Sequence, residues 1–144
     1  MNKERTKVLD RVVLAGVGPG FDKQENDPDV QEMKGLIEAA GLELVAVMLQ
    51  SRQKPDRATY IGKGKVEELR HLAEELEVAG VVFNVDLSPL QIRNLEEALE
   101  VDIIDRTMLI LQIFKDRARS HEGKLQVELA DLQYQLPRLT GRGK

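Results

Sequence analysis

The 144-residue chain is 42% hydrophobic and 32% charged with a formal net charge of −4, which is typical of a water-soluble globular protein of one domain, or one domain and an appendage. It has no cysteine, which excludes disulfides and thiolate chemistry. No apolar run approaches the roughly 18 residues that a membrane span needs, and the charged start lacks the apolar core of a signal peptide. We therefore expect no membrane span and a cytoplasmic location.

Four apolar runs predict β-strands, and they are nearly continuous, as in strands covered on both faces. The runs are Val12–Val17, Leu44–Leu49, Val81–Val85 and Val101–Ile104. Between them, apolar residues spaced three or four apart predict three amphipathic helices. Because parallel strands need helical crossovers, this order predicts an α/β fold: a small four-stranded, mainly parallel sheet with flanking helices.

Helix-capping residues support these boundaries. Asp27 followed by Pro28 predicts the start of one helix, and the capping box from Ser88 to Gln91 predicts another. Asp86 and Asp105 follow strands, where paired carboxylates could perform acid–base chemistry or hold Mg²⁺. Capping explains both residues without chemistry, and we favour that interpretation.

After Asp105 the pattern becomes purely helical. Two apolar stripes, each spaced 4, 3 and 4, flank a short turn that contains glycine, which predicts an antiparallel, coiled-coil-like helical hairpin ended by Pro137. The stripes are Thr107, Leu111, Phe114, Ala118 and Leu125, Leu129, Leu132, Leu136. We expect an α/β subdomain at 1–105, a hairpin subdomain at 106–138, and the start of a linker at 139–144.

The charge is divided unevenly between these parts. Residues 1–105 carry 13 Lys and Arg against 21 Asp and Glu, whereas residues 106–144 carry 8 against 4. A basic hairpin end could contact the phosphates or splayed bases of structured RNA. A solvated helix end is the alternative interpretation. The candidate RNA-binding residues are Lys115, Arg117, Arg119, His121 and Lys124.

A second candidate site precedes a predicted helix at Gly62, Lys63, Gly64 and Lys65. Glycines allow close backbone approach, and helix N–H groups and lysines favour a phosphate or other anion. The segment is not a Walker A loop, because Ala58 replaces the first glycine and Val66 replaces the Ser or Thr. By pattern alone, a tight loop that begins a helix remains the simpler interpretation.

The sequence predicts no metal site and no catalytic residues. Its two histidines, His71 and His121, are far apart, and no nucleophile, base and orienting group can be assembled.

Several stretches together resemble the HflX family of ribosome-associated GTPases. They are Lys54-Pro55-Asp56, Ala58–Lys65, Leu87-Ser88-Pro89, Gln91, Arg93–Glu96, Val101–Thr107, Arg117-Ala118-Arg119, Glu122–Ala130, Leu132-Gln133-Tyr134 and Leu136–Gly141. The resemblance covers most of the chain from about residue 42, and it implies an N-terminal domain of that family: an α/β subdomain followed by a helical hairpin.

The resemblance also implies partners. The family binds the large ribosomal subunit and splits stalled ribosomes, notably under heat stress, with the hairpin tip at the peptidyl transferase centre. Arg117, Arg119, Glu122, Gly123 and Lys124 would then contact ribosomal RNA. The family's GTPase domain, with GTP and Mg²⁺, is absent from this sequence, so no cofactor is expected within it unless ATP binds at Gly62–Lys65.

Three hypotheses follow. The first is a binding module for the large ribosomal subunit and its RNA, which would also meet the GTPase domain of the full-length protein. The second is an ATP-binding or ATPase domain that uses the Gly62–Lys65 loop. The third is a protein-docking or dimerisation module that uses the hairpin.

Overall fold

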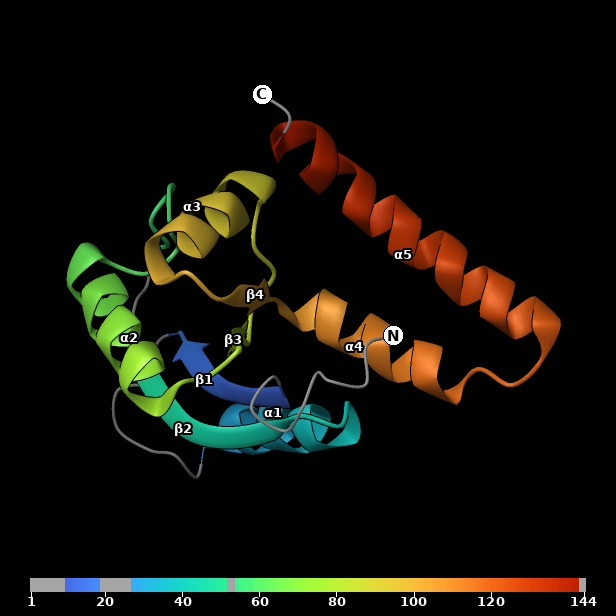
Figure 1. Ribbon diagram of the computed structural model, residues 1–144, viewed down its shortest axis with the longest axis horizontal. Helices are drawn as coiled ribbons and strands as arrows, with labels where there is room; N and C mark the ends of the chain where they lie inside the picture. The colour runs from blue at the N-terminus through green and yellow to red at the C-terminus, as the bar shows by residue number, and fades with distance from the viewer. Residues whose placement is uncertain (1–9, 19–26, 52–53, 143–144) are drawn as a thin grey trace.

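The computed structural model describes residues 10–18, 27–51 and 54–142 (Figure 1). Strands and helices alternate through the first seven elements, and two helices follow. In this part of the chain, no helix is both long and apolar enough to cross a membrane. The elements are β1 (Arg11–Val17), α1 (Pro28–Ala39), β2 (Glu43–Gln50), α2 (Lys63–Leu76), β3 (Gly80–Phe83), α3 (Pro89–Leu99), β4 (Asp102–Ile104), α4 (Arg106–Arg117) and α5 (His121–Arg142).

The four strands form one parallel sheet in the order β2-β1-β3-β4. This confirms the predicted α/β fold with a four-stranded parallel sheet. The chain adds β2 on one side of β1 and then crosses to the other side for β3 and β4. The only irregularity in the described pairing is a register shift between Val12 and Val13 against β2.

Helices cover both faces of the sheet, as the continuous apolar runs predict. On one face, Leu14 and Val82 pack with Met33 and Ile37 of α1 and with Leu109 of α4. The opposite face packs against α2 and α3, and its buried residues include Val13, Val81, Phe83, Leu69 and Leu95. The α5 helix lies outside these layers and packs against α3 and α4.

Three helices begin at the predicted caps. The Asp27 carboxylate accepts from the N–H of Asp29 at 2.8 Å, and Ser88 forms the full capping box with Gln91. Asp105 caps α4 by accepting from the N–H of Met108 at 3.0 Å. These contacts confirm that local capping chemistry determines where α1, α3 and α4 start.

The third strand ends earlier than predicted, at Phe83 rather than at Val85. The next residue, Asn84, turns its side-chain amide toward β1. Its oxygen accepts from the N–H of Val17 at 2.8 Å, and its nitrogen donates to the Val17 carbonyl at 3.1 Å. The Asn84 side chain thus makes the two hydrogen bonds to the Val17 backbone that a neighbouring strand would otherwise make.

The α4 and α5 helices run in opposite directions and are joined by residues 118–120 (Figure 1). The connection is shorter than predicted, since Gly123 lies in the first turn of α5 and its N–H donates to Ser120 Oγ at 2.9 Å. The prediction that Pro137 ends the second arm was wrong, because α5 continues through it to Arg142. Contacts of Tyr134 and Arg138 with Asp105 hold the helix on either side of the proline. The expected linker therefore starts as helix, and residues 143–144 lie outside the described part.

The two apolar stripes that predict the hairpin do not meet in the structure. The four leucines of the α5 stripe are 51–57% exposed, and Phe114 on α4 is 55% exposed. The partly buried face of α5 instead carries Val127, Ala130, Asp131, Tyr134, Gln135 and Arg138. The seam between the arms is therefore mostly polar, and the leucine stripe faces away from it.

Candidate functional site

The basic residues predicted to bind RNA lie around the connection between α4 and α5. Arg117 is the last residue of α4, Arg119 lies in the connection, and His121 and Lys124 lie in the first turn of α5. All four are exposed. Figure 1 places this connection, which we call the hairpin tip, at the far end of the molecule from α2.

Backbone polarity at the hairpin tip favours the same chemistry. The N-terminus of α5 directs backbone N–H groups toward the tip, and such a helix end attracts anions. The C-terminus of α4 carries the opposite partial charge, which Lys115 and Arg117 offset in its last turn. Asp116 and Glu122 add two negative charges nearby. The tip therefore presents four exposed basic side chains around a helix N-terminus.

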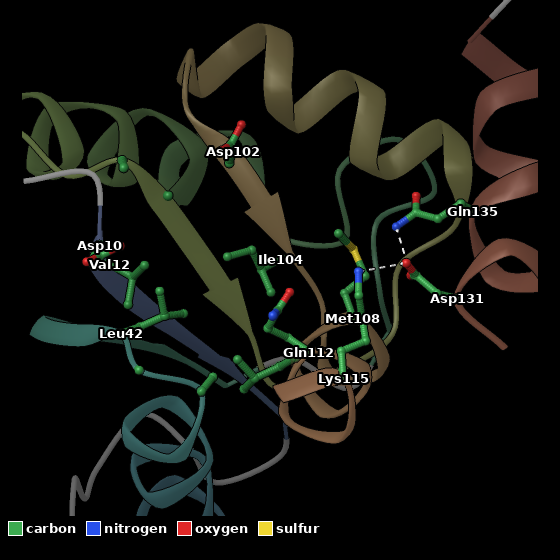
Figure 2. A pocket seen from close by; sticks show the side chains of 15 residues that line it. Asp10, Val12, Leu42, Asp102, Ile104, Met108, Gln112, Lys115, Asp131 and Gln135 are labelled. Carbon is green, nitrogen blue, oxygen red and sulfur yellow. Dashed lines mark hydrogen bonds and ion pairs between the residues drawn. The ribbon is translucent and has the colours of Figure 1, made fainter. Parts of the chain in front are cut away.

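Lys115 is placed differently from the other predicted RNA contacts. Its ammonium group lies 3.1 Å from the carboxylate of Asp131 on α5, and Gln135 also donates to that carboxylate at 3.5 Å. Figure 2 shows this pair crossing from α4 to α5. Lys115 thus joins the two arms rather than projecting from the hairpin tip.

The crossing pair lines a cavity of about 390 Å³ at the amino ends of β1, β3 and β4 (Figure 2). Apolar residues such as Ile104 and Met108 form part of its wall, while Asp10, Asp102 and Gln112 add polar groups. Its walls come from this edge of the sheet and from both arms of the hairpin. It was not predicted from the sequence, because its walls come from segments far apart in the chain.

The loop before α2 is held by hydrogen bonds within its own turn and by hydrogen bonds from α3. The Asp56 carboxylate accepts from the N–H groups of Ala58 and Thr59 at 2.7 and 3.1 Å. From α3, Gln91 donates to the Asp56 carbonyl at 2.8 Å and Asn94 donates to the Ala58 carbonyl at 3.0 Å. This loop therefore presents α2 in a fixed position.

The candidate phosphate site lies at the start of α2. Gly62 is the N-cap and forms no side-chain cap, unlike Asp27, Ser88 and Asp105. Lys63 and Gly64 are exposed, whereas Lys65 forms an ion pair with Glu68 at 3.2 Å. Figure 1 places α2 opposite the hairpin tip, so the two predicted sites are not brought together.

A buried polar cluster joins the hairpin, which is α4 and α5, to the α/β body, which is β1 to β4 with α1 to α3. Sequence patterns did not predict this cluster. Asp105 is 0% exposed. One oxygen of its carboxylate accepts from the Met108 N–H. The other accepts from the Leu87 N–H at 3.2 Å, from Arg138 at 3.3 Å and from the hydroxyl of Tyr134. Asp86 is exposed and accepts from the N–H and hydroxyl of Thr107, so both carboxylates serve the first turn of α4, as predicted.

Arg138 ties the cluster to two further groups. Its guanidinium donates to the Leu87 carbonyl at 2.6 Å and to the Tyr134 carbonyl at 3.0 Å, and it lies 3.6 Å from the centre of the Tyr134 ring. Burial, followed by the hydrogen bond to Asp105, raises the pKa of Tyr134 above its ordinary value. The available signal was a tyrosine and an arginine four residues apart on one helix face.

Two family models match the chain. The model described as "GTP-binding GTPase N-terminal" matches residues 27–115, and the model described as "GTP-binding GTPase Middle Region" matches residues 117–144. Together they cover the chain from α1 through the hairpin, and β1 lies before the first match.

Curated relatives named GTPase HflX match over most of the chain. The protein from Alkalihalophilus pseudofirmus is 44% identical over 143 residues, which are 99% of this chain and 34% of that protein. The protein from Escherichia coli is 44% identical over 119 residues, which are 83% of this chain and 28% of that protein. The chain thus spans about a third of the length of these relatives.

Solved structures share the fold. A GTP-binding protein from Sulfolobus solfataricus in complex with GDP matches 90% of this chain and 39% of its own chain, with 24% identity and a TM-score of 0.67. A complex described as SsGBP with GDP matches 91% of this chain and 37% of its own, also with 24% identity and a TM-score of 0.72. From the family models and the relatives together, we conclude that this chain belongs to the HflX family of GTPases and corresponds to their N-terminal part.

Proposed function

We propose that this chain is the ribosome-binding region of an HflX-like GTPase, and that its hairpin tip contacts ribosomal RNA of the large subunit near the peptidyl transferase centre. The observation that supports this proposal is the exposure of Arg117, Arg119, His121 and Lys124 at the narrow end of the hairpin. In the cell, this role would belong to the splitting and rescue of stalled ribosomes under stress.

The charge distribution suits such a partner. Residues 1–105 are net acidic and residues 106–144 are net basic, so a polyanion is attracted to the hairpin and repelled by the body. Arginine can donate to phosphate oxygens and can also stack its planar guanidinium on unpaired bases. A projecting hairpin with arginines at its tip therefore fits a groove or loop in folded RNA.

The proposal assigns nucleotide chemistry to another part of the protein. GTP and Mg²⁺ would bind a GTPase domain in the part of the relatives that this chain does not span. In this division of labour, the hairpin at 106–138 contacts the ribosomal RNA in the cytoplasm, the α/β subdomain at 1–105 positions the hairpin, and the GTPase domain acts on the ribosome.

A pelleting assay with purified large ribosomal subunits tests the proposal. The tip variant combines Arg117→Ala, Arg119→Ala and Lys124→Ala. The control variant combines Lys34→Ala, Lys54→Ala and Arg57→Ala, which removes the same charge from the part of the chain that precedes the hairpin and leaves Gly62–Lys65 intact.

The tip variant should bind more weakly, and its affinity should depend less on salt. The slope of log K against log salt is negative, and each lost phosphate contact reduces its magnitude by roughly 0.7–0.9, so the loss of three contacts reduces it by about 2–3. The control variant should keep the slope of the parent chain. Equal slopes and affinities for the tip variant and the parent would contradict the proposal.

A second candidate function is phosphate binding at Gly62–Lys65, which would make the domain responsive to ATP. The specific observation is that α2 starts without a side-chain cap, so its first N–H groups can donate to an anionic ligand beside Lys63. Calorimetric titration of the parent with ATP and Mg²⁺ should give heat that Lys63→Ala reduces. An absence of heat with the parent chain removes this candidate.

A further inference from the structure

Several of the stretches that resemble the HflX family lie outside both the hairpin tip and the candidate phosphate site at Gly62–Lys65. Leu87-Ser88-Pro89, Asp105-Arg106-Thr107 and the segment from Tyr134 to Arg138 belong to three separate parts of the sequence. The structure brings residues of all three to the same place, since Leu87, Tyr134 and Arg138 all contact Asp105. Neither RNA contact at the tip nor phosphate binding at α2 accounts for this convergence.

The cluster is a three-way junction. Leu87 follows β3, Asp105 and Met108 begin the first hairpin arm, and Tyr134 and Arg138 lie on the second arm. Arg138 donates to both the Leu87 carbonyl and the Asp105 carboxylate, so one side chain of α5 is bound to the body and to α4 at once. The second arm is thereby tied to both of its neighbours near its C-terminal end.

Apolar packing alone does not fix the position of α5. Its leucine stripe points away from the body, and the face that meets α4 carries Asp131 and Gln135 among its residues. Apolar contacts are non-directional, whereas hydrogen bonds hold their partners at defined distances and angles. The direction of the second arm therefore depends on the polar contacts made by Tyr134, Arg138 and the Lys115–Asp131 pair.

A buried ion pair of this kind is weak evidence for stability. Desolvation of both charges offsets much of their attraction, and apolar replacements of such pairs are often neutral or stabilising. Within the described residues, the Nε of Arg138 is also buried without a hydrogen-bond partner, which adds a further cost. What the cluster does provide is a unique arrangement, because its donors and acceptors match in only one relative position of the three segments.

We propose that Asp105, Tyr134 and Arg138 are positioning residues that set the direction in which the hairpin leaves the α/β body. Through that direction they determine where the hairpin tip meets its RNA, a part of the proposal that rests on the proposed function. The effect is amplified by length. From Arg138 to His121 the helix extends about 25 Å at 1.5 Å per residue, so a tilt of about 20° at the junction moves the tip by about 9 Å.

The test uses two variants that leave both backbone donors to Asp105 in place. Tyr134→Phe removes one hydroxyl, and Arg138→Met removes the guanidinium while keeping an apolar stem of similar reach. Lys34→Met is the control, because it removes one positive charge from α1. The chain has no native cysteine, so Glu75→Cys on α2 and Gln126→Cys near the tip can carry spin labels in every variant.

Electron-spin distance measurements should show a broader and shifted distribution for Tyr134→Phe and Arg138→Met, and the parent distribution for Lys34→Met. Circular dichroism should show the same helix content in all of them. If Arg138→Met does not fold, Tyr134→Phe alone decides the result. Distributions that match the parent in the folded variants would overturn the proposal, whatever their ribosome binding.

Pelleting with large subunits separates the two proposals. If the arm points correctly about a tenth of the time, the apparent affinity falls about tenfold. Broadened distances with this loss support both proposals. Broadened distances, together with parent-like binding by the variant that lacks the three basic tip residues, support the positioning role and refute RNA contact at the tip. Broadened distances with full affinity, while that tip variant binds weakly, overturn the link between direction and binding.

Discussion

Replacing Asp105 by alanine should be among the most damaging single substitutions in the α/β body. The carboxylate is completely buried and accepts from two backbone N–H groups, a phenol and a guanidinium. Removal of one partner from a buried charged pair costs about 3–5 kcal/mol, since the remaining groups lose their acceptor. The free energy of unfolding of a domain is only about 5–15 kcal/mol, so Asp105→Ala should remove a large part of it.

Urea unfolding followed by circular dichroism measures this loss. With a slope of about 2 kcal/mol per molar urea, a loss of about 4 kcal/mol moves the midpoint by about 2 M. Asp86→Ala is the matched control, because Asp86 also accepts from the first turn of α4 but is exposed. It should cost about 1 kcal/mol or less. A loss below about 1 kcal/mol for Asp105→Ala would show that its carboxylate is not buried among these donors.

Three further predictions concern pH, capping and packing. Because the pKa of folded Tyr134 is raised above the ordinary 10.0, its contribution to stability is complete below pH 10 and is lost as the pH rises toward the folded value. Unfolding free energies measured above pH 10 should therefore fall more steeply for the parent than for Tyr134→Phe, and equal slopes would contradict the burial of the Tyr134 hydroxyl beside Asp105. Ser88→Ala should lower the unfolding free energy by about 1 kcal/mol, because the N–H of Gln91 loses its 3.1 Å acceptor; an unchanged urea midpoint would argue against the capping box. Leu95→Ala, at a 0% exposed position, should cost about 2–5 kcal/mol, whereas Leu129→Ala, at a 57% exposed position, should cost about 0.5 kcal/mol or less. Equal costs at the two positions would show that the leucine stripe is a buried seam.

The order of strands and helices in the α/β body could be predicted because local chemistry decides it. The segment from Val12 to Val17 is apolar at every position except Gly16, and the structure covers it on both faces. Ser88 and Gln91 satisfy each other within one turn, so the start of α3 needs no distant partner. The order of the strands in the sheet could not be predicted, because the sequence of β3 does not determine on which side of β1 it pairs.

For the hairpin, the spacing of apolar residues predicted the helices but not how they pack. The spacing of Leu125, Leu129 and Leu132 establishes an apolar face, but it does not say what covers that face. Pro137 predicts a helix end from backbone chemistry, and it was overridden by contacts of the residues on either side of it. Exposed charge at the hairpin tip could be predicted from composition. The pairing of Lys115 with Asp131 could not, because it depends on how two helices face each other.

The residues that contact Asp105 are synthesised at different times. During synthesis the chain emerges from its N-terminus, and Arg138 follows Asp105 by 33 residues. At about 5–20 residues per second, this delay is about 2–7 s. Meanwhile Leu87 and Met108 can already donate to the carboxylate, because both are synthesised before Arg138. The second arm is therefore synthesised after all four strands of the sheet, and Arg138 is the last of the described partners of Asp105 to be made.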